Sequence, residues 1–323
     1  MSQRWKLVLI LSLFGSTADA DDPMPKQDPA IDEAGTPGEN DPAPAPTPAP
    51  AARLPQLNKR MVNRPPRVES PGSAVARSRA VMIDDGQSKL DKAEDKVEGG
   101  RHWRIKTAAG AVHVWAPPGY NRETAGTVVY VHGYWTDVDN AWREYQLAKQ
   151  FRMSRQNALF IVPEAPASNE DNVKWSALTD LRKAVARANI KMPDGPIVVI
   201  GHSGAFRTVM QWVDHKLVDQ IILLDAMYAG EKAFDEFIKS GKRADEHKMI
   251  VVGASVARAS VGFSQQYKFA VAREKFPETL GGFTKAERRA KLLYVRSQYD
   301  HMAIVTSRKV IPLLLRVTRL KPL

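Results

Sequence analysis

The feature that most constrains the fold is a regular alternation of short apolar runs with longer amphipathic stretches. The apolar runs are rich in Val, Ile and Leu and lie at residues 111–117, 127–133, 158–164, 196–202, 220–226, 249–255 and 292–297. Several are continuously apolar rather than alternating, which is typical of strands covered on both faces of a parallel sheet.

The stretches between these runs have the spacing of amphipathic helices. Within 176–188, for example, Leu178, Leu181 and Val185 recur at intervals that place them on one helical face. Helices are expected at 140–151, 176–188, 205–216 and 231–239, within 258–273, and from residue 302 onward. Strand and helix repeated in this way predict an α/β fold with a mostly parallel sheet and helices on both faces.

The N-terminus has the pattern of a secretory signal peptide, expected at residues 1–20. Arg4 and Lys6 flank the start of the apolar run LVLILSLF, and the segment STADA ends in an Ala-x-Ala cleavage pattern at Ala20. The apolar run is too short to span about 30 Å of hydrocarbon, so no transmembrane span is expected in the mature chain. We therefore expect a secreted or periplasmic protein.

Residues 21–100 are expected to form a disordered tether and a polar lead-in. Residues 21–67 are rich in Pro and Ala, with the run PAPAPTPAP, and offer too little apolar surface to offset the loss of chain entropy, and residues 68–100 remain polar and join the tether to the domain. The folded domain is accordingly expected at 101–323.

Charge and cysteine content narrow the possible partners and chemistry. The chain has no cysteine, which excludes disulfides, a thiol nucleophile and a thiolate metal site. Its 47 Lys and Arg outnumber its 36 Asp and Glu, and no acidic residue follows Asp300. This basic C-terminal segment favours an anionic surface such as an envelope polymer or lipid headgroups, although a solvated basic surface explains it equally well. Nucleic acid is not expected, because basic and aromatic residues do not cluster in a binding motif.

The segment Gly201-His202-Ser203-Gly204-Ala205 raises the question of a catalytic serine. A serine between glycines can be a plain turn residue or part of a phosphate-binding loop. Here, however, it follows the apolar run 196–200 and opens an amphipathic stretch, which is the strand–turn–helix setting of a nucleophile elbow. At these residues the chain resembles the α/β-hydrolase fold family, over roughly residues 101–323. The family pattern is Gly-x-Ser-x-Gly, from which Ala205 departs without loss of small size.

The resemblance implies a general base in the loop after the last strand. Of the seven histidines, His301 alone follows the last expected strand. The family's acid usually ends the strand two after the nucleophile, but that segment has no carboxylate before Glu274. Asp225 ends the strand one earlier, where some family members place their acid. A turn aspartate is the other interpretation of Asp225, and Glu164 is its main rival for the role.

The resemblance also implies an oxyanion hole and no metal or organic cofactor. His132-Gly133-Tyr134-Trp135 resembles the family's His-Gly turn, so the backbone amides of Tyr134 and Gly204 are expected to bind the oxyanion. Trp135, Trp175 and Glu164 are candidates for substrate contact, with a core position as the alternative for the tryptophans.

Together these features predict an exported serine hydrolase that cleaves a carboxylic ester through an acyl-enzyme. An amidase or peptidase acting on a cell-envelope peptide of peptidoglycan is the enzymatic alternative. A domain that only binds an envelope component is the alternative of another class.

Overall fold

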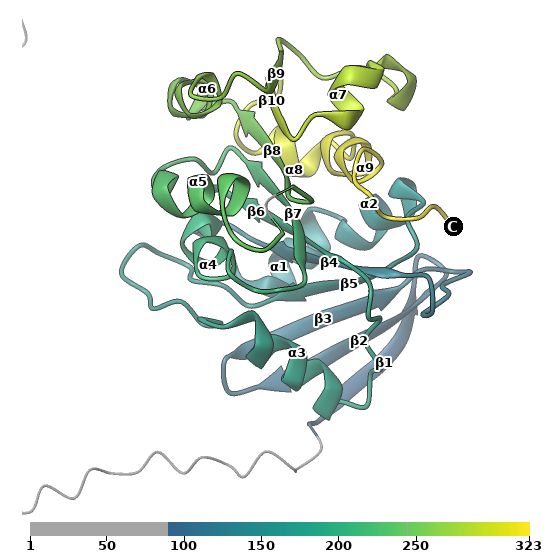
Figure 1. The fold of residues 1–323 in the computed structure, drawn as a ribbon. Coiled ribbons are helices and arrows are strands. Elements are labelled where there is room, and N and C mark those ends of the chain that lie inside the picture. The colour runs from purple at the N-terminus through teal and green to yellow at the C-terminus, as the bar shows by residue number, and fades with distance from the viewer. Residues whose placement is uncertain (1–89, 244) are drawn as a thin grey trace, which may run out of the picture. The chain divides into compact units, whose positions relative to one another are not determined.

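The computed structural model describes residues 90–243 and 245–323, so the expected signal peptide and all but the last residues of the expected tether lie outside the described residues. These described residues form one sheet of ten strands in the order β1-β2-β3-β5-β4-β6-β7-β8-β10-β9 (Figure 1). The strands are β1 (Lys92–Val97), β2 (Gly100–Thr107), β3 (Gly110–Ala116), β4 (Gly126–Val131), β5 (Ala158–Pro163), β6 (Ile197–His202), β7 (Val218–Leu224), β8 (Lys248–Gly253), β9 (Ala270–Arg273) and β10 (Leu292–Arg296).

The sheet is parallel from β5 through β9 and antiparallel only at the end that holds β1, β2 and β3. Helices lie on both of its faces: α1 (Val138–Glu144), α2 (Leu147–Ser154), α3 (Leu178–Arg187), α4 (Phe206–Met210), α5 (Glu231–Lys239), α6 (Ala257–Gln265), α7 (Lys285–Arg289), α8 (Ala303–Thr306) and α9 (Val310–Leu315). The predicted class, an α/β fold with a mostly parallel sheet and helices on both faces, is confirmed.

Two apolar cores explain why the central strands are continuously apolar. Val129 and Val131 face the core beneath α3, α4 and α5, whereas Val128 and Tyr130 of the same strand face the core beneath α1, α2 and α9. Successive side chains of a strand point to opposite faces, so a strand between two cores needs apolar residues throughout. Each fully buried aliphatic or aromatic side chain contributes about 1.5–3 kcal/mol through burial.

The structure corrects the expected start of the folded domain. β1 and β2 form an antiparallel hairpin, so the boundary expected at Arg101 falls inside that hairpin. Its turn residues, Glu98 and Gly99, have φ of 50° and 76°, as a two-residue type I′ turn requires. β1 escaped prediction because its sequence, KAEDKV, is charged and mostly exposed. β9 was also missed; it is a short edge strand inside the stretch expected to be helical.

Strand register brings distant residues together at the carboxyl edge of the sheet. His202 pairs with Leu224 across β6 and β7, so Ser203 and Asp225 come next at the same level. Val131 of β4 pairs with Gly201, which places the loop after β4 beside the turn that holds Ser203. No helix among the described residues is long and apolar enough to cross a membrane.

Candidate active site

Ser203 stands on a strained turn between β6 and a short helical segment. Its φ is 53°, a left-handed value that is uncommon for a residue with a side chain. The turn is possible because its neighbours are small. A Cβ on Gly204 would lie 2.4 Å from the Tyr134 ring, and one on Gly201 would lie 2.8 Å from the Val209 side chain. Alanine is accommodated at Ala205, which is buried without a comparable clash.

Ser203, His301 and Asp225 form a continuous hydrogen-bonded chain. The Ser203 Oγ lies 3.0 Å from His301 Nε2, and His301 Nδ1 lies 2.6 Å from Asp225 Oδ2. With Nδ1 protonated and donating to the carboxylate, Nε2 is free to accept the serine proton. The three side chains that the sequence suggested as nucleophile, base and acid therefore meet at one edge of the sheet.

The Asp225 carboxylate is fully buried and held by backbone amides. Its Oδ1 accepts from the amides of Ala254 and Val256 at 2.7 and 2.9 Å, and its Oδ2 accepts from the amide of Ser255 at 3.0 Å. Burial alone would raise the pKa of this carboxyl, but the hydrogen bonds from His301 and these amides outweigh it and hold the pKa well below its usual range. Asp225 therefore stays ionised beside the imidazole.

His202, which sequence reasoning set aside, holds the loop that carries His301. Its Nε2 donates to the carbonyl oxygen of His301 at 3.0 Å, and the two rings lie 4.7 Å apart. Burial lowers the pKa of His202 to about 4, so the ring is neutral at physiological pH. Asp300 does not orient the base; its side chain accepts from the amides of Met302 and Ala303, at the start of α8.

The loop of residues 132–137, between β4 and α1, lies against Ser203, and we call it the oxyanion loop after the role expected from the sequence. A Cβ on Gly133 would be 2.7 Å from the Ser203 Cβ, so only glycine allows this approach. Among the described residues, the backbone amide of Tyr134 has no hydrogen-bond acceptor, and Gly204 lies in the first turn of a 3-10 helix (Ser203–Ala205), where backbone amides have no intrahelical acceptor. An oxyanion hole requires two such backbone N–H groups, free to donate, next to the serine.

Arg207 joins two loops around the site and was not foreseen from the sequence. Its guanidinium donates to the Tyr134 hydroxyl at 3.1 Å and to the carbonyl oxygens of Ser168, Asn169 and Asp171 at 3.3, 2.8 and 2.9 Å. Because Arg207 lies on α4, directly after the nucleophile turn, it ties the oxyanion loop and the loop after β5 to Ser203.

A cleft of about 510 Å³ opens over Ser203. Of the described residues, no Lys, Arg, Asp or Glu lines it, and its walls are mostly aromatic, with Asn169 as a neutral polar group. Trp135 is 89% exposed at the rim with a φ of 65°, a strained value for a bulky residue. On the other wall the Phe206 and Tyr228 rings stack at 5.9 Å.

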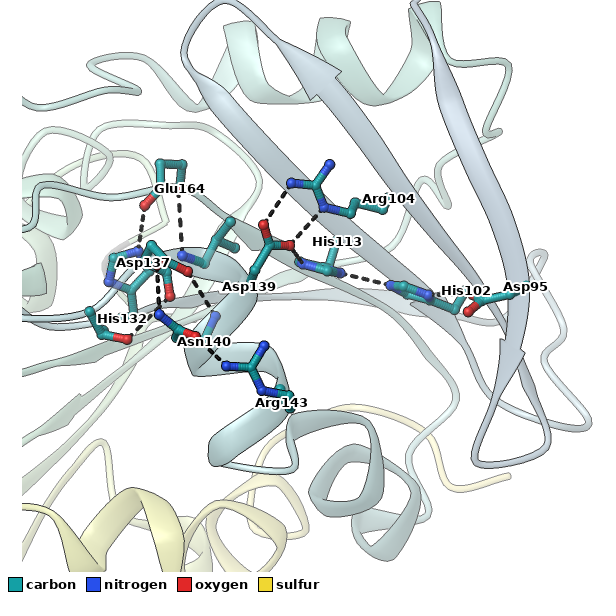
Figure 2. Close-up of polar contacts among 12 residues, drawn as sticks. Asp95, His102, Arg104, His113, His132, Asp137, Asp139, Asn140, Arg143 and Glu164 are labelled. Carbon is teal, nitrogen blue, oxygen red and sulfur yellow. Dashed lines mark hydrogen bonds and ion pairs between the residues drawn. The ribbon is translucent and has the colours of Figure 1, made fainter.

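Two of the residues expected to contact substrate lie elsewhere. Glu164 follows β5 and contacts His132 Nε2 at 3.0 Å, away from the cleft (Figure 2). Trp175 is 6% exposed in the core, and its carbonyl oxygen accepts from the Trp212 indole. Only Trp135 of the three candidates lines the cleft.

No family model matches the chain, and no curated protein matches it in sequence. Several solved structures resemble it. An S-formylglutathione hydrolase from Agrobacterium tumefaciens has 12% identity and a TM-score of 0.44 and aligns over 72% of this chain and 100% of its own. Fluorophosphonate-binding serine hydrolase F from Staphylococcus aureus has 10% identity and a TM-score of 0.45, with coverage of 72% and 100%. A hyperthermophilic esterase from Pyrobaculum calidifontis has 12% identity and a TM-score of 0.40, with coverage of 70% and 85%. Similarities this low do not decide what this chain does.

Proposed function

We propose that the protein is an exported serine hydrolase that cleaves uncharged carboxylic esters. The observation that carries the proposal is the unbroken hydrogen-bonded chain from Ser203 Oγ through His301 to the buried Asp225 carboxylate. Export is supported by the signal-peptide pattern at the N-terminus.

In the proposed reaction, Ser203 Oγ attacks the ester carbonyl carbon while His301 Nε2 takes its proton. The amides of Tyr134 and Gly204 donate to the resulting oxyanion, and losing one such donor typically costs about 3 kcal/mol in the barrier. The intermediate collapses as His301 returns the proton to the departing alkoxide, which leaves as an alcohol. Water then gives a proton to His301 and attacks the acyl carbon, and Ser203 leaves with that proton restored.

The cleft favours an ester over a charged envelope peptide. Its described lining has no Lys, Arg, Asp or Glu to pair with a charged substrate group, whereas Trp135, Phe206 and Tyr228 offer aromatic surface. An ionic group buried without a partner is costly. A substrate with an uncharged acyl or alcohol group fits this lining best, and the basic C-terminal segment remains a candidate for attachment to an anionic surface.

The test is covalent labelling by a fluorophosphonate probe, followed by turnover of short p-nitrophenyl esters beside neutral amides and peptidoglycan peptides. We expect the wild-type protein to be labelled, Ser203→Ala to remain unlabelled, and esters to be hydrolysed fastest. Equal labelling of the two proteins would refute the nucleophile, and hydrolysis of peptides alone would refute the ester assignment.

A further inference from the structure

A second chain of histidines and carboxylates lies outside the cleft, across β1, β2, β3 and α1 (Figure 2). Asp95 Oδ1 lies 2.6 Å from His102 Nδ1, His102 Nε2 lies 2.8 Å from His113 Nδ1, and His113 Nε2 lies 2.8 Å from Asp139 Oδ1. We call these four residues the histidine relay. No group of three or more His, Asp or Glu among the described residues is arranged to hold a metal ion.

The two imidazoles of the relay are buried, whereas its carboxylates are partly open to solvent. The side chains of His102 and His113 are 8% and 4% exposed, and those of Asp95 and Asp139 are 65% and 43% exposed. The Trp142 ring lies nearly parallel to both imidazoles, at 4.8 and 4.9 Å. The stacked Trp142 ring and the contacts at both nitrogens of each imidazole therefore fix the orientation of the two rings.

The hydrogen bonds of the relay require one more proton than two neutral imidazoles carry. Each ionised carboxylate can only accept, so His102 Nδ1 and His113 Nε2 must both be protonated. The contact between the rings needs one further proton, on either His102 Nε2 or His113 Nδ1. This makes three protons on two imidazoles, and hence one positive charge.

The surroundings of His113 favour its neutral form. Burial lowers the pKa of His113 to about 4. Arg104, which bonds Asp139, also disfavours a positive charge on His113. The other charged groups of the adjoining cleft are Glu98, Arg143 and Lys149.

The relay ends on the helix that follows the oxyanion loop. Asp139 lies in the first turn of α1, and its two oxygens also accept from Arg104 at 2.7 and 2.6 Å. The start of α1 is thereby fixed to β2 and β3 by side chains of both strands. At the other end of the same loop, His132 contacts Glu164, so the segment that carries Tyr134 is held at both ends.

We propose that the histidine relay is a positioning device, which fixes the start of α1 and thereby the Tyr134 amide opposite Ser203. The inference rests on the proposed function, because it assigns the relay a part in oxyanion binding. Asp139 and His113 are positioning residues, since neither lines the cleft. A displacement of the Tyr134 amide by less than about 1 Å would weaken its hydrogen bond to the oxyanion of the transition state more than it would weaken binding of the substrate ground state.

The test compares Asp139→Asn with Glu94→Gln in the full chain. Glu94 is a matched control because it bonds Arg101 across the same β1 and β2 hairpin but is not part of the relay. For Asp139→Asn we expect kcat on a short neutral ester to fall about 10- to 100-fold with KM within about twofold. Inhibition by an aryl trifluoromethyl ketone, whose tetrahedral adduct needs the oxyanion donors, should weaken by the same factor. Glu94→Gln should change neither.

Nitrogen NMR of the wild-type histidine rings supplies a second measurement that needs no variant. We expect one doubly protonated and one singly protonated ring in the relay at pH 7, and two neutral rings would overturn the proposal. A folded Asp139→Asn with wild-type kcat and ketone inhibition would also overturn it. Absence of ester turnover by the wild-type protein would instead refute the proposed function, so the two failures are distinguishable.

Discussion

Asp225→Asn is the substitution whose consequence the structure specifies most closely. Both carboxylate oxygens of Asp225 only accept: Oδ1 faces the amides of Ala254 and Val256, and Oδ2 faces the Ser255 amide and His301 Nδ1. Asparagine has a single oxygen, so its NH2 group must face donors on one side. At the Oδ1 position it would oppose two backbone N–H groups that cannot lose their protons. At the Oδ2 position it opposes only one, because His301 Nδ1 can lose its proton and accept.

The second orientation is therefore the less costly, and it forces His301 into the wrong tautomer. With Nδ1 accepting from the amide, the ring proton moves to Nε2, which can no longer take the proton of Ser203. We expect kcat to fall about 10⁴-fold, which is about 5.5 kcal/mol in the barrier. KM should change little, because Asp225 does not line the cleft.

The assay is turnover of p-nitrophenyl acetate at pH 7, with Ser203→Ala setting the background rate. Asp219→Asn is the matched control: it removes another buried carboxylate, at the opposite end of β7, where Asp219 pairs with Arg243 and Arg319. That variant should keep its kcat. The reasoning would be refuted if kcat fell less than tenfold in Asp225→Asn. It would also be refuted if kcat fell further in Glu164→Gln than in Asp225→Asn.

Three further predictions concern pH, the oxyanion loop and the loop clamp. Burial depresses the pKa of His113 and His202 to about 4 in the folded protein, against 6.5 unfolded, so the unfolded chain binds more protons between these values. The free energy of unfolding, measured in urea, should therefore fall by about 3 kcal/mol per histidine as the pH drops from 6.5 to 4; a flat profile would contradict this. Gly133→Ala places a Cβ 2.7 Å from the Ser203 Cβ and should slow fluorophosphonate labelling about 100-fold without abolishing folding by circular dichroism. Arg207→Met removes the hydrogen bonds that join the two loops and should raise KM about tenfold in ester kinetics. An unchanged KM would show that the loops keep their positions without Arg207.

The main elements of the site were predictable because they depend on chain order. In a parallel sheet every strand ends at the same edge, so a serine, an acid and a histidine that each follow a strand are expected to gather there. Ser203, Asp225 and His301 fit that rule, and their contacts require no knowledge of side-chain packing. The continuous apolar runs also identified the central strands, because a strand buried on both faces needs apolar residues along its whole length.

The antiparallel end of the sheet could not be predicted in the same way. β1 is an edge strand with charged, exposed side chains, so neither alternation nor an apolar run marks it. The only local signal was its turn at Glu98-Gly99, whose backbone demands positive φ. His102 and His113 also depend on this end, because their contact exists only when Arg104 pairs with His113 across β2 and β3. A shift of one residue in that register would turn one ring to the other face.

This protein has two hydrogen-bonded groups of histidines and carboxylates, and their comparison shows that residue types alone do not identify a catalytic site. Both join imidazole to aspartate at 2.6–2.8 Å. They differ in the group that the last imidazole nitrogen contacts. His301 Nε2 meets the hydroxyl of Ser203, which a strained turn presents to an open cleft, so a proton taken there creates a nucleophile. His113 Nε2 meets Asp139, already bonded to Arg104, so a proton there has no reacting atom to activate. Under the two proposals, the pairing of imidazole with aspartate serves bond cleavage at Ser203 and rigidity at the start of α1.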